Sequence, residues 1–138
     1  MADLKKVQSK IYNKNIRILD CNVPLDTKGI SIDLKDKKCI YINRPNIQSL
    51  DDEFCVLAHE YGHIESGAMH KLDSRLDLIG RHEYRANRKA VLEFLPVDLL
   101  IEAKEKGCKQ PYEVAEYLNV PEEFVNLAYE HYKNMDAI

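Results

Sequence analysis

The sequence lacks the features that mark membrane-spanning, secreted or nucleic-acid-binding proteins. No stretch of about 18 apolar residues is present, so no transmembrane helix is expected. The segment from Met1 to Lys6 is polar and has no apolar part of a secretory signal. Basic residues number 20 against 23 acidic ones, and the net charge of −3 leaves no broad basic surface for nucleic acid. We therefore expect a cytoplasmic protein with no direct membrane or nucleic-acid partner.

Closely spaced cysteines are also missing. Cys21, Cys39, Cys55 and Cys108 are far apart, and none forms the Cys-x-x-Cys pair of a thiolate zinc site. Disulfide bonds are rare in the cytosol. We interpret the four cysteines as reduced thiols that fill the core, a role that suits Cys55 best because it falls inside an apolar helix.

The chain does contain enough apolar residues for one hydrophobic core. Of its 138 residues, 45% are hydrophobic and 31% are charged, which is typical of globular proteins. It has no internal repeat and no low-complexity segment. We expect a single domain over residues 1–138.

Hydrophobic periodicity predicts an α+β fold. Apolar residues alternate with others over 30–34 and 39–43, which indicates a hairpin with its turn at 36–38. Ser49 and Asp52 have the spacing of a capping box at the start of a helix that ends near Gly67. Further elements are expected as helices at 3–14, 79–94, 97–106, 111–118 and 121–134, a strand at 16–19 and a polar loop at 68–78. The predicted architecture is a small antiparallel sheet packed against helices, with a helical cap over about residues 108–138.

The most informative segment is His59-Glu60-Tyr61-Gly62-His63, an H-E-x-x-H motif on the capped helix. Residues four apart lie on one helix face, so both imidazoles can reach the same ion. Glu60 is offset from His59 by about 100°. It can hold a water beside the ion and accept its proton without being a ligand. The motif predicts a catalytic Zn²⁺ site with Glu60 as the general base.

A catalytic zinc site normally takes a third protein ligand, and several residues compete for this place. A His-x-x-Gly-x-x-His extension would need glycine at position 66 and histidine at position 69, but the chain has Ser66 and Met69. His70, Asp73 and Asp77 follow in the polar loop and stay possible.

Glu83 is better placed than these loop residues. It lies at the start of the next long predicted helix, and Ala86 and Ala90 fall on its face. Small residues at those positions would let this helix approach the His59 helix closely. We therefore favour Glu83 as the third ligand of a set with His59 and His63.

These segments together resemble the ImmA/IrrE family of metallopeptidases, in its phage or mobile-element branch. The resemblance covers roughly residues 25–100, and the order and separation of the segments agree. The matching parts are the Ile30–Ile42 hairpin, the His59–His63 motif, Glu83-x-x-Ala86-Asn87-x-x-Ala90, and Leu95-Pro96. One departure is Lys89 before Ala90, where the family usually has an aromatic residue.

The resemblance implies a zincin-like α+β domain in which His59, His63 and Glu83 bind zinc and Glu60 is the general base. It also implies a protein substrate, since family members are similar to proteases that cleave helix-turn-helix repressors of phages or mobile elements. The alternative is a zinc-bearing regulatory interaction module without significant protease activity. An intact Glu60 favours the enzyme, because a structural zinc site needs no general base.

Supporting roles have several candidates each. A second donor could face the developing oxyanion, and further polar groups should orient the imidazoles. Candidates for the oxyanion donor are His70, His82 and Tyr84, and those for imidazole orientation are Asp51, Asp52 and Asn87. The hairpin could also border the substrate cleft.

The C-terminal segment has a helical pattern that resembles a DNA reader, but its charge opposes that role. Residues 111–138 hold six acidic side chains and one basic one, whereas a phosphate-binding face needs positive charge. We interpret the segment as a cap on the core or a docking surface for a protein.

Overall fold

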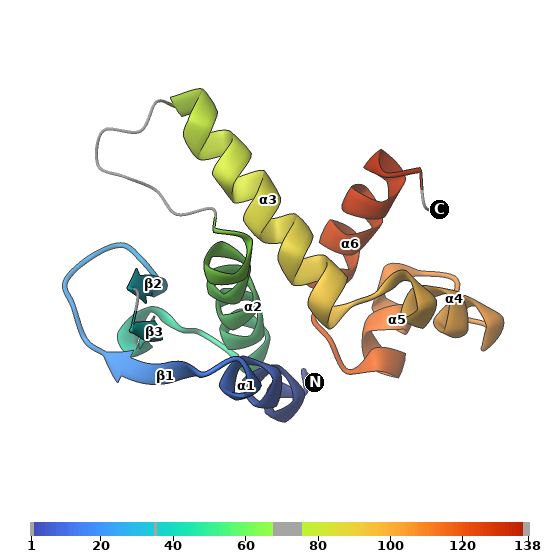
Figure 1. The fold of residues 1–138 in the computed structure, drawn as a ribbon. Coiled ribbons are helices and arrows are strands. Elements are labelled where there is room, and N and C mark those ends of the chain that lie inside the picture. Colours follow the sequence, from blue (N-terminus) through green and yellow to red (C-terminus); the bar gives the residue numbers. More distant parts are fainter. Residues whose placement is uncertain (1, 35, 68–75, 137–138) are drawn as a thin grey trace.

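The computed structural model describes residues 2–34, 36–67 and 76–136, without the side chains of 76–79. The elements in chain order are α1 (Leu4–Asn13), β1 (Ile16–Cys21), β2 (Gly29–Leu34), β3 (Lys37–Asn43), a 3-10 helix (Arg44–Asn46), α2 (Leu50–Ser66), α3 (Leu76–Phe94), α4 (Val97–Glu105), α5 (Pro111–Leu118) and α6 (Glu122–Asn134). Figure 1 shows α2 in the middle, with the sheet and α1 on one side of it and α3 and α6 on the other.

The sheet confirms that the two predicted hairpin strands pair, but it corrects the turn and the neighbouring strand. Lys37 and Lys38, predicted in the turn, begin β3 and pair with Leu34 and Asp33. β2 and β3 pair antiparallel, as the alternating pattern predicts. β1 pairs with β3 in parallel, however, so the sheet has the order β1-β3-β2 and is mixed. The expectation of a purely antiparallel sheet was wrong because the connection after β1 carries the chain to the far edge, and β3 then returns between the other two strands. The α+β class is confirmed.

A buried asparagine fixes that connection. Asn43 is fully buried, and its side-chain oxygen accepts a hydrogen bond of 3.1 Å from the backbone N–H of Val23. Its amide nitrogen donates to the carbonyl oxygen of Thr27 at 2.8 Å, and Asn46 donates to the same oxygen at 2.7 Å. These bonds hold the stretch that leads into β2, which lines the pocket described below.

The helix with the motif begins and ends as predicted. The hydroxyl oxygen of Ser49 accepts from the backbone N–H of Asp52 at 3.0 Å, which caps the N-terminus of α2. Gly67 ends the helix in the left-handed conformation, with φ of 69°. The motif therefore lies on a helix with two fixed ends.

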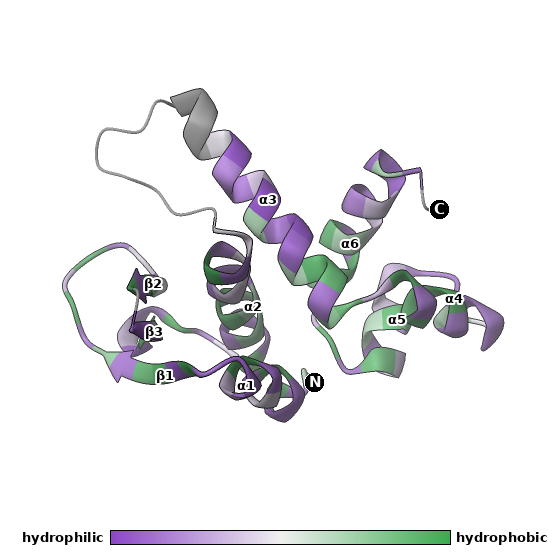
Figure 2. Cartoon of the chain, viewed as in Figure 1, coloured by the Kyte–Doolittle hydropathy of each residue, from purple (hydrophilic) through white to green (hydrophobic). Residues whose placement is uncertain are grey.

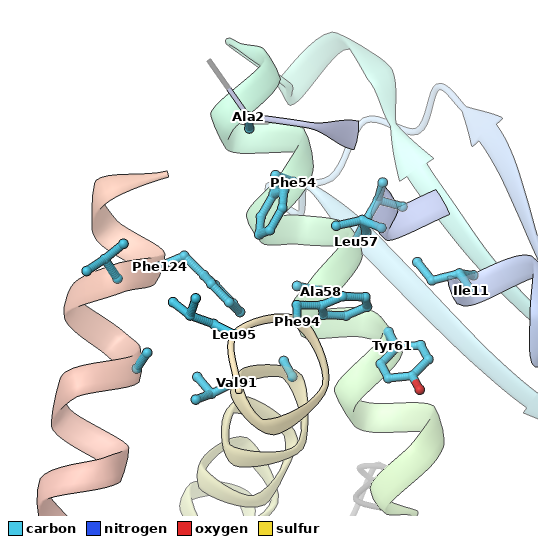
Figure 3. Close-up of a cluster of buried hydrophobic side chains, with 14 of the residues drawn as sticks. Ala2, Ile11, Phe54, Leu57, Ala58, Tyr61, Val91, Phe94, Leu95 and Phe124 are labelled. Atoms are coloured by element: carbon cyan, nitrogen blue, oxygen red, sulfur yellow. The ribbon is translucent and has the colours of Figure 1, made fainter. Parts of the chain in front are cut away.

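The core lies where α2, α3 and α6 meet. Figure 3 shows Phe54, Phe94 and Phe124 converging from these three helices. The ring of Phe54 is edge-on to those of Phe124 and Phe94, with centroid distances of 5.2 and 6.4 Å. Tyr61 packs edge-on against Phe94 at 5.0 Å. One cluster of buried side chains thus joins the motif helix to the C-terminal helices.

The third helix and the C-terminal helices largely match their predicted bounds. α3 begins at Leu76, three residues before the predicted start at 79. Residues 68–75, most of the predicted polar loop, lie outside the described part. Figure 2 shows α3 hydrophilic along much of its length and hydrophobic near its C-terminal end, where it meets the core. α5 and α6 cover that end through Val114, Val125 and Ala128, which confirms the helical cap.

Candidate metal centre

Three side chains from two helices converge on one point. The Nε2 atoms of His59 and His63, both on α2, lie 3.1 Å apart. Glu83 of α3 places one carboxylate oxygen 2.8 Å from Nε2 of His59 and the other 3.0 Å from Nε2 of His63. The side chain of His63 is 6% exposed, whereas those of His59 and Glu83 are about one-third exposed, at 32% and 38%. The cluster therefore has a buried side and an open side.

A hydrogen bond sets the orientation of the His59 ring. Its Nδ1 lies 2.8 Å from the amide oxygen of Asn87, one turn after Glu83 on α3. An amide oxygen only accepts, so this contact places the ring proton on Nδ1. The lone pair of Nε2 then faces His63 and Glu83, as a metal ligand requires.

Small residues allow the two helices to approach so closely. Ala86 and Ala90 are buried where α3 crosses α2, as the sequence predicts. Gly62 completes this contact, because a Cβ at this position would lie 2.0 Å from the carbonyl oxygen of Ala86. Sequence reasoning missed Gly62, although a glycine inside a helix is itself a sign of close packing.

A pocket of about 480 Å³ opens beside the three side chains. Glu60 lines it together with His59, His63 and Glu83. The opposite wall is the first part of β2 and the residues before it, from Thr27 to Ser31. Gly29 lets this strand lie against α2, since a Cβ there would be 3.2 Å from Cγ of Glu60 and 2.6 Å from Cγ1 of Val56.

The donor set fits a metal ion. One atom from each of His59, His63 and Glu83 can be chosen so that all lie within 4.8 Å of one another. Donors around a tetrahedral zinc ion with bonds near 2.0 Å are separated by about 3.3 Å, close to the 2.8–3.1 Å found here. Two imidazoles and a carboxylate are also ligands that zinc accepts.

Of the residues predicted to orient the imidazoles or to face the oxyanion, only some lie near the candidate metal centre in the described part of the chain. Among the candidates for imidazole orientation, Asn87 contacts His59, whereas Asp52 pairs with Lys28 at 2.9 Å. Asp51 is exposed in the first turn of α2. Tyr84 packs its ring on that of His131, with centroids 4.6 Å apart. Among the described residues, the lining of the pocket includes neither Tyr84 nor His82.

Three predicted alternatives cannot be placed. His70 and Asp73, proposed as ligands or as an oxyanion donor, lie outside the described residues. Asp77 lies in the first turn of α3, and its side chain is outside the described part. Among the described residues, the three-residue cluster with metal-ligating geometry is the one that includes Glu83.

Two imidazoles and a carboxylate around one point, with a further glutamate in the same pocket, are typical of metallopeptidases. The family profile of Peptidase_M78, the IrrE N-terminal-like domain, matches residues 13–129, and the chain belongs to this metallopeptidase family. The match confirms the ImmA/IrrE resemblance of the motifs. No characterised protein and no solved structure matches the chain significantly. None of the described helices is long and apolar enough to cross a membrane.

Proposed function

We propose that the protein is a zinc-dependent endopeptidase in which His59, His63 and Glu83 hold the ion and Glu60 is the general base. The observation that carries this proposal is the convergence of the Nε2 atoms of His59 and His63, 3.1 Å apart, with the two carboxylate oxygens of Glu83, which lie 2.8 and 3.0 Å from them. Membership of a peptidase family supports the same reaction class. The substrate is accordingly a protein.

The residues of the chain divide the work of peptide-bond hydrolysis. Zinc supplies Lewis acidity when bound, polarising the scissile carbonyl and making water more acidic. Glu60 accepts the proton of the attacking water and delivers it to the leaving amine. Asn87 holds His59 in the tautomer that keeps its lone pair on Nε2.

The wall opposite Glu60 suits an extended peptide. β2 is an edge strand of the three-stranded sheet, with β3 on one side, and its first residues line the pocket. An extended substrate can add to such an edge through main-chain hydrogen bonds. The predicted role of the hairpin as a border of the cleft is therefore part of this proposal.

We further propose that the substrate is a helix-turn-helix repressor of a phage or mobile element. The support is the ImmA/IrrE resemblance, since proteases of that kind relieve repression by cleaving such proteins. Co-incubation with the repressor encoded beside this chain tests the idea. Metal-dependent cleavage is expected, whereas a stable complex without cleavage would instead indicate a regulatory interaction module.

The zinc content and turnover of three variants test the proposed roles. Wild-type protein should bind about one zinc per chain, and Glu83→Ala should lose most of it. Glu60→Gln should keep the zinc and lose hydrolysis, because the amide cannot accept the proton. Glu102→Ala removes an exposed carboxylate of α4 and is the control that should change neither property. Full zinc binding by Glu83→Ala, or full turnover by Glu60→Gln, would contradict the respective assignment.

A further inference from the structure

A second pocket adjoins the metal pocket on the other side of His59. Its volume is about 290 Å³, and it shares Lys28, Val56 and His59 with the lining of the first pocket. Residues of α2, α3 and α6 line it, so α6 forms one wall of a space next to the candidate metal centre. Figure 1 shows how these three helices are arranged. The two pockets therefore meet at these three shared residues.

Apolar groups form much of this second pocket. α2 contributes Val56, α3 contributes Ala90, and α6 contributes Phe124 and Leu127. Cys55 adds a thiol, and burial together with nearby Glu123 raises the pKa of this thiol well above its ordinary value. The thiol is therefore neutral, and it behaves as a small apolar group.

Most polar groups in the lining are engaged with one another. Lys28 pairs with Asp52 at 2.9 Å, and His59 bonds to Asn87 at 2.8 Å. Although burial raises the pKa of Asp52, hydrogen bonds from Lys28 and from the backbone of Gln48 outweigh it and lower the pKa. Asp52 thus stays ionised in its pair. Glu123 is the remaining charge and is exposed at the rim.

We propose that this second pocket is a specificity subsite that receives one large apolar side chain of the substrate, such as leucine, methionine or phenylalanine, beside the scissile bond. The inference rests on the proposed peptidase function. It adds a preference for one kind of substrate side chain, which the candidate metal centre alone does not specify. An acidic side chain would meet Asp52 and Glu123, and a basic one would meet Lys28 and could pair with Glu123 only at the exposed rim. An apolar side chain avoids both and buries its surface against Val56, Phe124 and Leu127.

Binding of zinc-chelating peptidyl hydroxamates to the zinc-loaded protein tests this subsite without requiring turnover. One series carries glycine, leucine, phenylalanine, lysine or aspartate on the N-terminal side of the chelating group, and a second series carries them on the C-terminal side. In one of the two series, leucine or phenylalanine should bind at least about ten-fold tighter than glycine. Lysine and aspartate should show no such gain.

Variants of Leu127 connect that gain to the second pocket. Leu127 is partly exposed on α6 and lines the pocket. Leu127→Glu introduces a charge and Leu127→Trp fills the space, so both should abolish the gain while the glycine compound binds as before. Ile101→Glu makes the same change at an exposed position of α4 and should keep the gain. Two different substitutions keep the test valid if one of them fails to fold.

The outcomes separate the subsite from the proposed function. Tight binding of the glycine compound with no gain for leucine or phenylalanine would overturn the subsite alone. A gain that survives both Leu127 variants, or a gain for lysine instead, would also overturn it. A folded wild-type protein that binds neither zinc nor the glycine compound would overturn the proposed function and the subsite with it.

Discussion

Asn87 contacts the candidate metal centre through His59 without being one of the candidate ligands. It lies one turn after Glu83, so a single face of α3 supplies both a candidate ligand and the acceptor for His59. This acceptor fixes the ring plane and the tautomer of His59, whereas a free imidazole would sample several orientations and both neutral tautomers. The pair Glu83 and Asn87 therefore acts on the two imidazoles from one rigid helix.

Replacing Asn87 should weaken zinc binding without removing a ligand. We expect Asn87→Ala to lower zinc affinity by about 10–100-fold, the usual effect of losing a group that orients a ligand. Asn87→Asp should restore most of the affinity, because a carboxylate also accepts from Nδ1. Competition with a chelator of known affinity measures both variants. Equal affinity of Asn87→Ala and wild type would show that His59 needs no such support.

The candidate ligands could be predicted from the sequence because each depends on local spacing. His59 and His63 face one way on any helix, and Glu83 follows from a helix with small residues on the same face. The second pocket could not be predicted in this way. Its walls come from Lys28, α2, α3 and α6, and no periodicity in one segment indicates which distant segments will meet.

At the scale of elements, the distance between α2 and α3 determines whether the carboxylate of Glu83 can reach the imidazoles of His59 and His63. These helices cross where Gly62 faces the backbone of Ala86, with the candidate ligand His63 one residue away on α2 and Glu83 three residues away on α3. Gly62 has no side chain, and its partner in this contact is a main-chain carbonyl, which cannot rotate aside. A larger residue at this point must move a whole helix.

Gly62→Ala should therefore weaken both the fold and the metal site. The added methyl group would meet the carbonyl oxygen of Ala86 at 2.0 Å, and such overpacking typically costs about 1–3 kcal/mol. Zinc affinity should fall as well, because α3 carries Glu83 away from the histidines. Thermal unfolding with and without zinc, together with zinc titration, measures both effects.

Gly80→Ala is the matched control for this substitution. Gly80 is exposed on α3, and a Cβ there meets nothing within 4 Å among the described atoms. Alanine should stabilise the helix there by up to about 1 kcal/mol and leave zinc binding unchanged. If Gly62→Ala behaved like Gly80→Ala, the close crossing would not set the geometry of the site.

Local signals predicted the bounds of most elements, whereas they did not predict which strands pair. Caps and periodicity placed α2, α4, α5 and α6 within a residue or two. The short pattern of β1 says that it is a strand with a buried end, but not that its neighbour will be β3 in parallel register. Strand order depends on the path of the connection after β1. The side chain of Asn43 holds this connection at Val23 and Thr27, from which it is 20 and 16 residues away along the chain.

At the scale of the whole molecule, α6 attaches the C-terminal cap to the helices that carry the candidate metal ligands. The hydroxyl group of Tyr132 donates to the carbonyl oxygen of Leu95 at 2.7 Å, and burial raises its pKa to about 12, so it stays a donor at neutral pH. His131 packs on Tyr84, the residue after Glu83. Because α6 also forms a wall of the second pocket, its attachment bears on specificity as well as stability.

His131 makes this attachment sensitive to acid. The side chain is buried, and its Nδ1 has no hydrogen-bond partner among the described residues. Burial lowers the pKa of His131; Glu130 opposes this effect and Arg88 reinforces it. A base with a lowered pKa in the folded state takes up protons more readily when unfolded. Above the unfolded-state pKa of about 6.5, His131 is neutral in both states and costs no stability. As the pH falls below that value, protonation of the unfolded chain lowers the free energy of unfolding.

His131→Phe should remove this part of the pH dependence. Phenylalanine keeps a ring against Tyr84 but cannot bind a proton, so the variant should lose less stability than wild type between about pH 6.5 and 5. At pH 8 its melting temperature should equal or exceed that of wild type, because no buried nitrogen is left without a partner. Both proteins are melted in chelator, so that metal binding contributes to neither pH profile. Parallel pH profiles would mean that His131 keeps its ordinary proton affinity in the folded protein and that acid acts on the cap through other groups.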